Sequence, residues 1–408
     1  MTDPLPVNVD DVRVAADALQ GVARRTPMEP ARWLAEMVGG PVWLKCENLQ
    51  RAGSFKIRGA YTRIARLTAE ERGRGVVAAS AGNHAQGVAL AASLLGSPAT
   101  VFMPEGASLV KERATRGYGA TVRLIGTSVD EAVVAAREHA EATGAVFVHP
   151  FDHPDIVAGQ GSLGLEVLEQ VPDVVTVVVC TGGGGLLAGI ACAVRSGRPD
   201  ARIVGVQADG AAAYPPSLWA GHPVALDSMS TMADGIAVGR PGDVPFAMVR
   251  ALVDEIITVD EDAISRALVR LLERNKLLVE PAGAVAVAAL MERPEAFRPP
   301  VVATVSGGNI DPLLLQRVVR HGMAADGRFL SFRVAIPDTP GALATLLATL
   351  AQVGANVLDV VHERTRASLQ VDEVDVWVVV ETRGPEHRDA VLQAVRDTDI
   401  GWRVRVEP

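Results

Sequence analysis

Lys56 is the residue whose setting in this sequence points most directly to chemistry. It lies between Phe55 and Ile57 in a short stretch that begins at Gly53 and ends at Gly59-Ala60. Lysine is rarely buried without a partner, and burial lowers the pKa of its amine. More of the amine is then neutral near pH 7 and able to form an imine with a carbonyl. An ordinary surface lysine at a helix start explains the stretch equally well when it is taken alone.

Four consecutive glycines, Gly182 to Gly185, lie between Thr181 and Leu186, where an expected strand gives way to an expected helix. Backbone without side chains can approach a ligand closely there and present N–H groups beside the positive end of the helix. The pattern indicates a phosphate-binding loop. It does not match the P-loop consensus, and the acidic residue that follows a dinucleotide-binding glycine motif is not evident. A tight turn without a ligand is the alternative.

The residues Ser80, Ala81, Gly82, Asn83 and His84 also lie between an expected strand and a helix. Their small size would let backbone donors face a substrate carboxylate at the helix N-terminus, so all five are candidate substrate-binding residues. Asn83 can also donate an uncharged hydrogen bond to a phenolic oxygen, or it can simply cap the helix. For His84 a structural role is favoured over that of a base.

A fourth stretch, Ser306-Gly307-Gly308-Asn309, places a hydroxyl group at the end of an expected buried strand. This is where α/β sheets bind their ligands. Taken alone, the stretch is more typical of a turn that follows a strand.

The composition narrows the class of protein that carries these residues. A chain of 408 residues favours two or three domains, and 49% hydrophobic with 21% charged residues is typical of globular proteins. The formal net charge of -9, without a Lys/Arg-rich block, argues against nucleic-acid binding. We therefore expect small molecules and other copies of the chain as partners.

The sequence favours a cytoplasmic protein. Cys46, Cys180 and Cys192 have neither CxxC spacing nor the even count of a disulfide framework, which fits a reducing compartment. The N-terminus lacks a basic segment followed by an apolar run, so we expect no secretory signal. The longest apolar tract, Val174 to Val194, is interrupted by glycines and is predicted to be a strand, a loop and a helix, with no membrane span.

Strands and helices are expected to alternate along most of the chain, which predicts a parallel sheet of the α/β class. The expected strands cover 42–46, 75–79, 99–103, 121–124, 145–148, 174–180, 202–207 and 301–306. The expected helices cover 12–22, 83–95, a segment from 108, 129–143, a segment near 161–170, a segment after the glycines, and 261–275. Each of the four candidate stretches follows one of these strands.

The C-terminal part of the chain has a different pattern. Residues 322–328 are predicted to be a linker. The elements expected beyond it are strands at 329–335, 356–364, 373–382 and 402–406 and helices at 340–353 and 385–396. This βαββαβ order is the ferredoxin-like arrangement, and about 80 residues suffice for it as a separate domain.

Together, the four candidate stretches resemble the pyridoxal-phosphate enzymes of the tryptophan-synthase-β fold type (fold type II), specifically the threonine/serine dehydratase family. The resemblance runs from about Asp10 to Met323 and is carried by 55–60, 80–86, 182–186 and 231–239. It implies a catalytic core of two parallel-sheet α/β subdomains over 1–322, with the smaller subdomain at about 53–148.

The resemblance implies pyridoxal 5'-phosphate as the cofactor and gives each candidate a role. Lys56 would hold the cofactor aldehyde and remove the α-proton, Phe55 would pack against the ring, Asn83 would bond the ring hydroxyl, Gly182 to Leu186 would hold the phosphate, and Ser306 would face the pyridine nitrogen. A hydroxyl at that position stabilises a neutral pyridine and favours β-elimination over transamination. The expected reactions convert threonine to 2-oxobutanoate and ammonia, and serine to pyruvate.

The tail resembles an ACT domain, an amino-acid-sensing module, through Asp338-Thr339-Pro340-Gly341-Ala342-Leu343. Residues 328–408 are therefore expected to be regulatory, with Asp338, Pro340, Gly341, Ala342 and Leu343 forming a backbone site for an amino-acid effector. A purely dimerising domain is the alternative. In either case we expect a homo-oligomer, a dimer or a tetramer.

Two positions depart from the racemase relatives of this family. Their second serine in the asparagine loop corresponds to Ala81, which disfavours racemisation. Their acidic cation-binding side chains are largely missing from 205–213, where Asp209 alone remains, so we expect no metal. A serine-preferring dehydratase and an amino-acid sensor without turnover remain as alternative functions.

Overall fold

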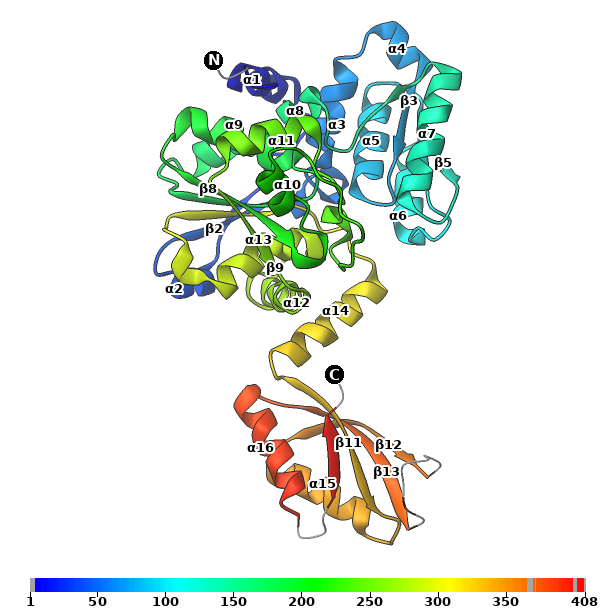
Figure 1. The fold of residues 1–408 in the computed structure, drawn as a ribbon, viewed down its shortest axis with the longest axis vertical. Helices are drawn as coiled ribbons and strands as arrows, with labels where there is room; N and C mark the ends of the chain where they lie inside the picture. The colour runs from blue at the N-terminus through cyan, green and yellow to red at the C-terminus, as the bar shows by residue number, and fades with distance from the viewer. Residues whose placement is uncertain (1–3, 365–369, 371, 399–401, 407–408) are drawn as a thin grey trace. The chain divides into compact units, whose positions relative to one another are not determined.

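The computed structural model describes residues 4–364, 370, 372–398 and 402–406 (Figure 1). The chain divides into two compact units, Met1–Leu315 and Gln316–Pro408. Among the described residues, none of the helices combines the length and apolar content that crossing a lipid bilayer requires.

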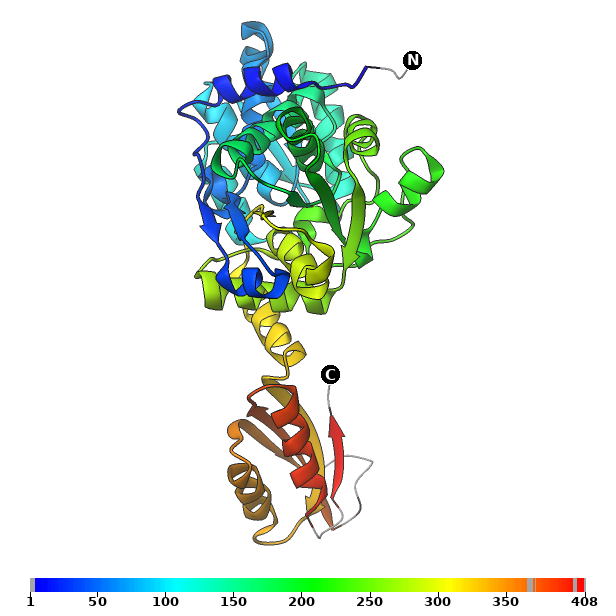
Figure 2. The same ribbon diagram turned by 90° about the vertical axis from the view of Figure 1, so that its left-hand side faces the viewer.

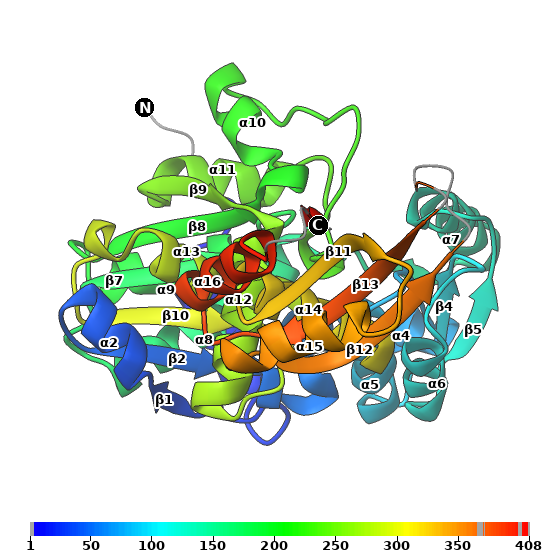
Figure 3. The same ribbon diagram turned by 90° about the horizontal axis from the view of Figure 1, so that it is seen from below.

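The larger sheet of the first unit has six strands in the order β1-β2-β10-β7-β8-β9, which can be followed in Figure 3. Its strands are β1 (Met28–Pro30), β2 (Val42–Cys46), β7 (Thr176–Cys180), β8 (Arg202–Ala208), β9 (Glu255–Val259) and β10 (Val301–Val305). All neighbours are parallel except β1, which runs antiparallel to β2. Every residue of β7 and β10 is buried, as expected for central strands whose two faces are covered by helices.

The smaller sheet of the first unit has four parallel strands in the order β5-β4-β3-β6. They are β3 (Val76–Ala79), β4 (Ala99–Met103), β5 (Thr121–Leu124) and β6 (Val146–Phe147). Apolar residues of β3 and β4 contribute to packing on both faces of this sheet. The two sheets confirm the predicted α/β core with two parallel-sheet subdomains.

Helices surround both sheets of the first unit (Figure 2). The α-helices are α1 (Val9–Ala18), α2 (Arg32–Val38), α3 (Lys56–Ala65), α4 (Ala69–Arg74), α5 (Asn83–Leu94), α6 (Leu109–Gly117), α7 (Val129–Thr143), α8 (Pro154–Gln170), α9 (Gly185–Gly197), α10 (Tyr214–Ala220), α11 (Asp243–Leu252), α12 (Glu261–Arg270) and α13 (Pro281–Glu292). The next helix, α14 (Pro312–Ala325), begins in the first unit and continues into the second. Single helical turns are η1 (Glu47–Leu49), η2 (Arg51–Gly53), η3 (Asp209–Ala211), η4 (Asp234–Ile236) and η6 (Pro294–Ala296), and η5 (Leu271–Asn275) is a π-helix.

The second unit is an antiparallel sheet in the order β12-β13-β11-β14. Its elements are β11 (Phe329–Pro337), α15 (Ala342–Gln352), β12 (Asn356–Glu363), β13 (Glu373–Glu381), α16 (Pro385–Arg396) and β14 (Arg403–Val406). Alternate residues of β11 are buried, and they share one apolar cluster with residues of α15 and α16. Both helices therefore cover the same face of the sheet, which confirms the ferredoxin-like arrangement.

Several expected boundaries were wrong. The expected linker begins inside a helix, because 322–325 form the last turn of α14 and the non-helical connection to β11 is only 326–328. The glycine at 322 suggested a break, but its Met-Ala-Ala successors are good helix formers. The helix expected near 161–170 already begins at Pro154, where His153 caps it, and the first helix is displaced toward the N-terminus because Asn8 forms a capping box with Asp11.

Candidate functional site

The lysine stretch lies against the turn that follows β10. Ser54 and Gly307 form an antiparallel bridge, the Phe55 amide donates to Ser306 O at 3.2 Å, and the Gly308 amide donates to Gly53 O at 2.9 Å. These backbone contacts join two of the four candidate stretches, although they are far apart in the sequence. Lys56 is the first residue of α3 and follows directly.

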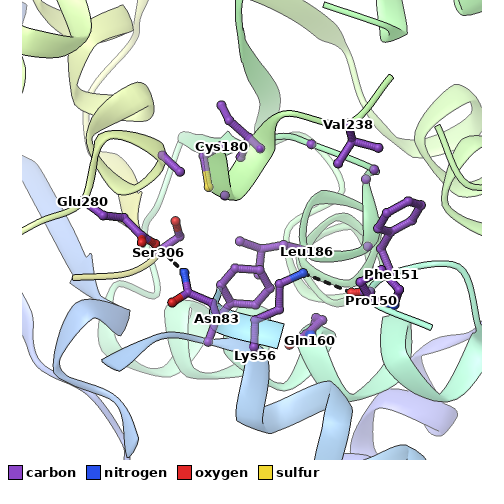
Figure 4. Close-up of a pocket in the computed structure, with 18 residues that line it drawn as sticks. Lys56, Asn83, Pro150, Phe151, Gln160, Cys180, Leu186, Val238, Glu280 and Ser306 are labelled. Carbon is purple, nitrogen blue, oxygen red and sulfur yellow. Dashed lines mark hydrogen bonds between the residues drawn. The ribbon is translucent and has the colours of Figure 1, made fainter. Parts of the chain in front are cut away.

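The amine of Lys56 is held inside a pocket (Figure 4). Its Nζ donates a hydrogen bond to Pro150 O at 3.0 Å and lies 5.1 Å from the centroid of the Phe55 ring. Burial lowers the pKa of Lys56 to about 8, and the charges of Cys180 and Glu280 oppose that shift in part. A substantial fraction of the amine is therefore neutral and nucleophilic near neutral pH.

The glycine loop joins β7 to α9, and its shape requires glycine. Gly184 has a φ of +96°, and a Cβ there would lie 1.8 Å from the Tyr214 hydroxyl oxygen. A Cβ on Gly183 would lie 2.4 Å from the Phe151 ring. The amides from Gly184 onward precede the first hydrogen bond of α9, from the Ala188 amide to Gly184 O at 2.8 Å. Such amides at a helix N-terminus are suited to an anion.

Of the five residues in the asparagine loop, Asn83 lines the pocket and the other four do not. Ser80 Oγ accepts a hydrogen bond from the Gly82 amide at 3.1 Å, which shapes the turn into α5. The first hydrogen bond of α5 runs from the Gln86 amide to Gly82 O at 3.4 Å. The earlier amides of this helix have no intrahelical acceptor, so they are potential donors to a carboxylate.

The His84 ring is turned away from the pocket. It is buried, and its Nε2 lies 2.8 Å from Val148 O. Burial, with the nearby Lys56 charge, lowers the pKa of His84 to about 3, so the ring is neutral at physiological pH. The ring thus contacts the protein interior, which agrees with the structural role favoured for it. Only the backbone amide of His84, at the start of α5, remains as a potential donor to a ligand.

Ser306 ends the central strand β10 and is buried at the base of the pocket. The Cys180 thiol, at the end of the neighbouring strand β7, is hydrogen-bonded to the Ser306 side chain. Burial raises the pKa of Cys180 to about 11, so the thiol is protonated and poorly nucleophilic near pH 7. The predicted hydroxyl therefore lies beside a neutral partner.

The pocket brings Phe55, Lys56, Asn83, Leu186, Ser306 and all four glycines together in about 540 Å³ of empty space. Its remaining lining residues are Pro150, Phe151, Gln160, Cys180, Gly235, Ile236, Val238, Glu280 and Ala282. Sequence reasoning assigned no role to these residues, although 235–238 lie within a stretch that carried the family resemblance. Their local sequence contains no signal of what they face in the fold.

The candidate regulatory residues belong to the second unit. Gly341 has a φ of +96° and precedes α15, so the chain turns sharply after Pro340. The Asp338 carboxylate makes a bidentate ion pair with Arg364, with distances of 2.9 and 3.2 Å. Hydrogen bonds from Arg364 hold the pKa of Asp338 below its usual value. The β11–α15 junction therefore combines the N-terminus of a helix, whose first amide, that of Ala342, donates to Thr339 O at 3.3 Å, with one ion pair.

Among the described residues, no group of three or more His, Cys, Asp or Glu side chains is arranged to hold a metal ion. Asp209 lies in η3, after β8.

Comparison with known families decides the identity of the fold. Residues 19–307 match the model of the family described as pyridoxal-phosphate dependent enzyme, and residues 331–399 match the ACT domain. The L-threonine ammonia-lyase of Thermotoga maritima is 45% identical over 400 residues, covering 98% of this chain and 99% of that protein. The chain belongs to the threonine dehydratase family of pyridoxal-phosphate-dependent enzymes.

Other members of the family support the same assignment. The L-threonine ammonia-lyase of Geobacter sulfurreducens is 46% identical, covering 97% of this chain and 98% of that protein. Among solved structures, the processed form of threonine deaminase isoform 2 from Solanum lycopersicum superposes with a TM-score of 0.74 at 36% identity, covering 79% of this chain and 91% of that one. Maize serine racemase has a TM-score of 0.73, also at 36% identity, and covers 76% of this chain and 96% of that one.

Proposed function

We propose that this protein is a threonine ammonia-lyase that uses pyridoxal 5'-phosphate to convert L-threonine to 2-oxobutanoate and ammonia, and L-serine to pyruvate and ammonia. The observation that carries the proposal is the Lys56 amine, which is desolvated in a pocket that also contains a glycine-built anion site and the Ser306 hydroxyl. The names of the full-length relatives support the choice of threonine.

The residues of the pocket fit the cofactor. When bound, pyridoxal phosphate supplies an aldehyde carbon that bonds to an amine and a ring that draws electrons from the substrate α-carbon. Lys56 would bond the aldehyde, and the amides of Gly182 to Leu186 would hold the phosphate group. The Phe55 ring would pack beside the pyridine, Asn83 would donate to its oxygen, and Ser306 would face its nitrogen. The observation that supports the phosphate assignment is that the glycine loop and the N-terminus of α9 line the pocket, where their amides can meet an anion.

Lys56 would act as the base of the elimination. With a pKa of about 8, the amine is near the operating pH, where a general base both exists in its neutral form and retains basicity. Pro150 O holds the amine at 3.0 Å and keeps it on one side of the pocket. The Ser306 hydroxyl and the Cys180 thiol present no negative charge to the ring nitrogen. Both therefore favour rapid expulsion of the β-hydroxyl over a long-lived carbanion.

The substrate carboxylate would bind at the N-terminus of α5. The backbone amides of Asn83 and His84, together with the Ser80–Gly82 turn, supply the hydrogen-bond donors and the positive end of the helix. Ala81 has no hydroxyl group with which to return a proton to the second face of the α-carbon. We therefore expect elimination and little racemisation, in contrast to the serine racemases that share the fold.

A steady-state assay tests the function directly. L-Threonine and L-serine would each be supplied to the purified protein, and 2-oxobutanoate, pyruvate and D-serine would be measured. Reduction with borohydride, followed by peptide mass spectrometry, should place the cofactor label on Lys56. Formation of neither 2-oxo acid by a protein that carries the label would refute the lyase assignment.

We further propose that residues 1–322 form the catalytic core, that 328–408 form an amino-acid-sensing regulatory domain, and that the enzyme is a cytoplasmic homo-oligomer. Asp338 and Pro340 to Leu343 would bind the effector, since the N-terminus of α15 offers amides and the Asp338–Arg364 pair offers both charges of a zwitterion. Trp219 is 92% exposed, and tryptophan is enriched in protein interfaces. The molar mass in solution, measured by light scattering, tests the assembly.

A further inference from the structure

Glu280 is a buried carboxyl group in the pocket that the proposed chemistry does not use. It precedes α13, is 2% exposed, and its amide donates to Gly307 O at 3.1 Å. A Cβ added to Gly307 would lie 2.1 Å from Glu280 Oε1. The carboxyl group is therefore packed directly against the turn that carries Ser306.

This carboxyl group is bonded to the side chain that is expected to contact the cofactor oxygen. Asn83 Nδ2 donates to Glu280 Oε1 at 2.5 Å, a dashed line in Figure 4. The other end of the same amide is also fixed, because Asn309 Nδ2 donates to Asn83 Oδ1 at 2.8 Å and to Ala52 O at 2.7 Å. Two of the three polar positions of the Asn83 amide are thus occupied by protein. One N–H remains for a ligand.

The orientation of this amide depends on the charge of Glu280. An ionised carboxylate only accepts hydrogen bonds, so it selects the Asn83 orientation that presents nitrogen. A protonated carboxyl group can donate, and it can then pair with Asn83 Oδ1 after the amide turns over. That reversed amide would face the Asn309 amide with nitrogen against nitrogen. Protonation therefore weakens the constraint that keeps an N–H directed to the ligand.

Charged groups from several elements face Glu280. Burial raises its pKa to about 7, with a further contribution from Asp234 on η4. Lys111 on α6, the hydrogen bond from Asn83, and Lys56 on α3 act in the opposite direction. Lys111 is itself paired with Asp234 at 2.6 Å, so these two charges largely offset each other. The proton on Glu280 is consequently exchanged within the physiological range.

We propose that Glu280 is a positioning residue whose carboxylate form locks the Asn83 amide with one N–H directed into the pocket, and whose protonation releases that lock. The inference rests on the proposed function for the identity of the ligand that receives this N–H. It makes cofactor affinity depend on a proton that neither the cofactor nor Lys56 carries. The substitution Glu280→Gln separates the two properties, because glutamine keeps an acceptor oxygen and loses the titration.

The test compares the dissociation constant of pyridoxal phosphate across pH in four proteins: wild type, E280Q, E280L and E295Q, an exposed control. The phosphate group titrates in all four proteins. The pKa of Lys56, which the Glu280 charge raises, is measured in each protein so that its contribution can be subtracted. Relative to E280Q, wild type and E295Q should bind about tenfold more weakly at about pH 6 than at about pH 8, as one proton with a pKa of about 7 requires. E280L, which has no acceptor for Asn83, should bind weakly at both pH values.

A second measurement does not depend on the cofactor. The infrared band of a protonated carboxyl group should disappear between about pH 6 and about pH 8 in cofactor-free wild type and should be missing from E280Q. Identical pH profiles of cofactor binding in wild type and E280Q would overturn the proposal, as would the lack of such a band. Failure to bind pyridoxal phosphate at any pH would instead contradict the proposed function, so the two failures are distinguishable.

Discussion

At the scale of single residues, we propose that the amine of Lys56 carries the chemistry, and a conservative replacement of Lys56 tests this role. K56R keeps a positive charge in the pocket but cannot lose a proton near neutral pH or bond the aldehyde. We expect the rate of 2-oxobutanoate formation to fall at least about 10³-fold, with the protein still folded.

The matched control is K276R, because Lys276 lies exposed after η5. It should retain wild-type turnover. Circular dichroism and thermal unfolding would show that both variants are folded, and near-normal activity in K56R would remove Lys56 from the mechanism.

The hydroxyl of Ser306 should control how the reaction partitions. S306D would place a carboxylate at the end of β10, where it would favour a protonated ring nitrogen and a longer-lived carbanion. We expect faster exchange of the α-hydrogen of serine with solvent deuterium, relative to pyruvate formation. The neutral variant S306A should not show this increase. An equal exchange-to-elimination ratio in both variants would mean that the ring-nitrogen contact does not set the partition.

The protonation of Glu280 should affect the free energy of unfolding as well as cofactor binding. Burial raises its folded-state pKa from 4.5 to about 7, so between those values the folded protein holds a proton that the unfolded chain has lost. Its contribution to the free energy of unfolding therefore decreases as the pH rises from about 4.5 to about 7, and is constant above that.

Urea unfolding of the cofactor-free proteins measures this contribution. Relative to E280Q, the free energy of unfolding of the wild type should decrease by on the order of 3 kcal/mol as the pH rises across that range. The exposed control E295Q should follow the wild type. A pH-independent difference between wild type and E280Q would show that Glu280 stays ionised throughout.

At the scale of elements, helix α3 is fixed to its neighbours by buried ion pairs. Arg58 Nε lies 2.8 Å from Glu47 Oε2 on η1, and its Nη1 lies 2.7 Å from Glu166 Oε1 on α8. Lys45 on β2 contacts the other oxygen of Glu166 at 2.5 Å. Two positive and two negative charges thus join four elements, and one of them, Arg58, lies two residues after Lys56. This network orients the helix that begins with Lys56.

Removing one charge from that network should destabilise the enzyme strongly. Burial alone would raise the pKa of Glu47, but the charge and hydrogen bonds of Arg58, with a hydrogen bond from Thr26, hold it below the usual value. E47Q leaves part of the positive charge unpaired in the interior, at a cost of about 3–5 kcal/mol.

The control is E169Q, because Glu169 forms a surface ion pair with Arg25 at 3.3 Å. This substitution should lower the free energy of unfolding by less than about 1 kcal/mol. Urea denaturation of both variants measures the two costs. Equal costs would mean that the buried network contributes no more than a surface pair.

The sequence predicted the bounds of strands and helices best where a run of apolar residues lies between residues that interrupt regular structure. The strands at 42–46, 99–103 and 121–124 and the helices at 129–143 and 385–396 have the predicted bounds. The linker at 322–328 was wrong, because a helix can continue through a glycine when neighbouring residues favour it. Strand β9 was missed because its run is short and lies close to a helix signal.

Which residues meet in the pocket was predictable where a loop carries its own signal. Lys56, Asn83, the glycines and Ser306 all line one pocket. Glu280 was missed because its local sequence, Glu-Pro-Ala-Gly, indicates only a helix start. Glu280 and Asn83 lie 197 positions apart in the sequence. Their contact depends on how distant elements pack in the fold, which local sequence patterns do not indicate.

At the scale of the whole molecule, the second unit should confer regulation without taking part in catalysis. It has its own hydrophobic core, and the Lys56 pocket lies entirely within the first unit. A truncation that ends at Asp326 keeps α14 intact and should still turn over threonine. In the full chain we expect a branched-chain amino acid, isoleucine or valine, to change the affinity by the ~5–150-fold that is typical of allosteric coupling, and in the truncated enzyme this response should be lost.

Activity titrated with isoleucine and valine in both proteins measures this difference. A truncated enzyme that keeps the full effector response would place the sensor in the core. A full chain that responds to no amino acid would leave the second unit with an assembly role only.

The position of β10 in the larger sheet has a consequence for how the protein is made on the ribosome. This strand lies between β2 and β7, yet it is the last strand of the unit to emerge. At about 5–20 residues per second, synthesis of the ~250 residues between β2 and β10 takes roughly 10–50 s. Until β10 emerges, β2 lacks its neighbour on one side, and so does β7 once it has been synthesised, so both present unpaired edges. The nascent chain is therefore a natural client for chaperones, and it can acquire its cofactor only when the core is nearly complete.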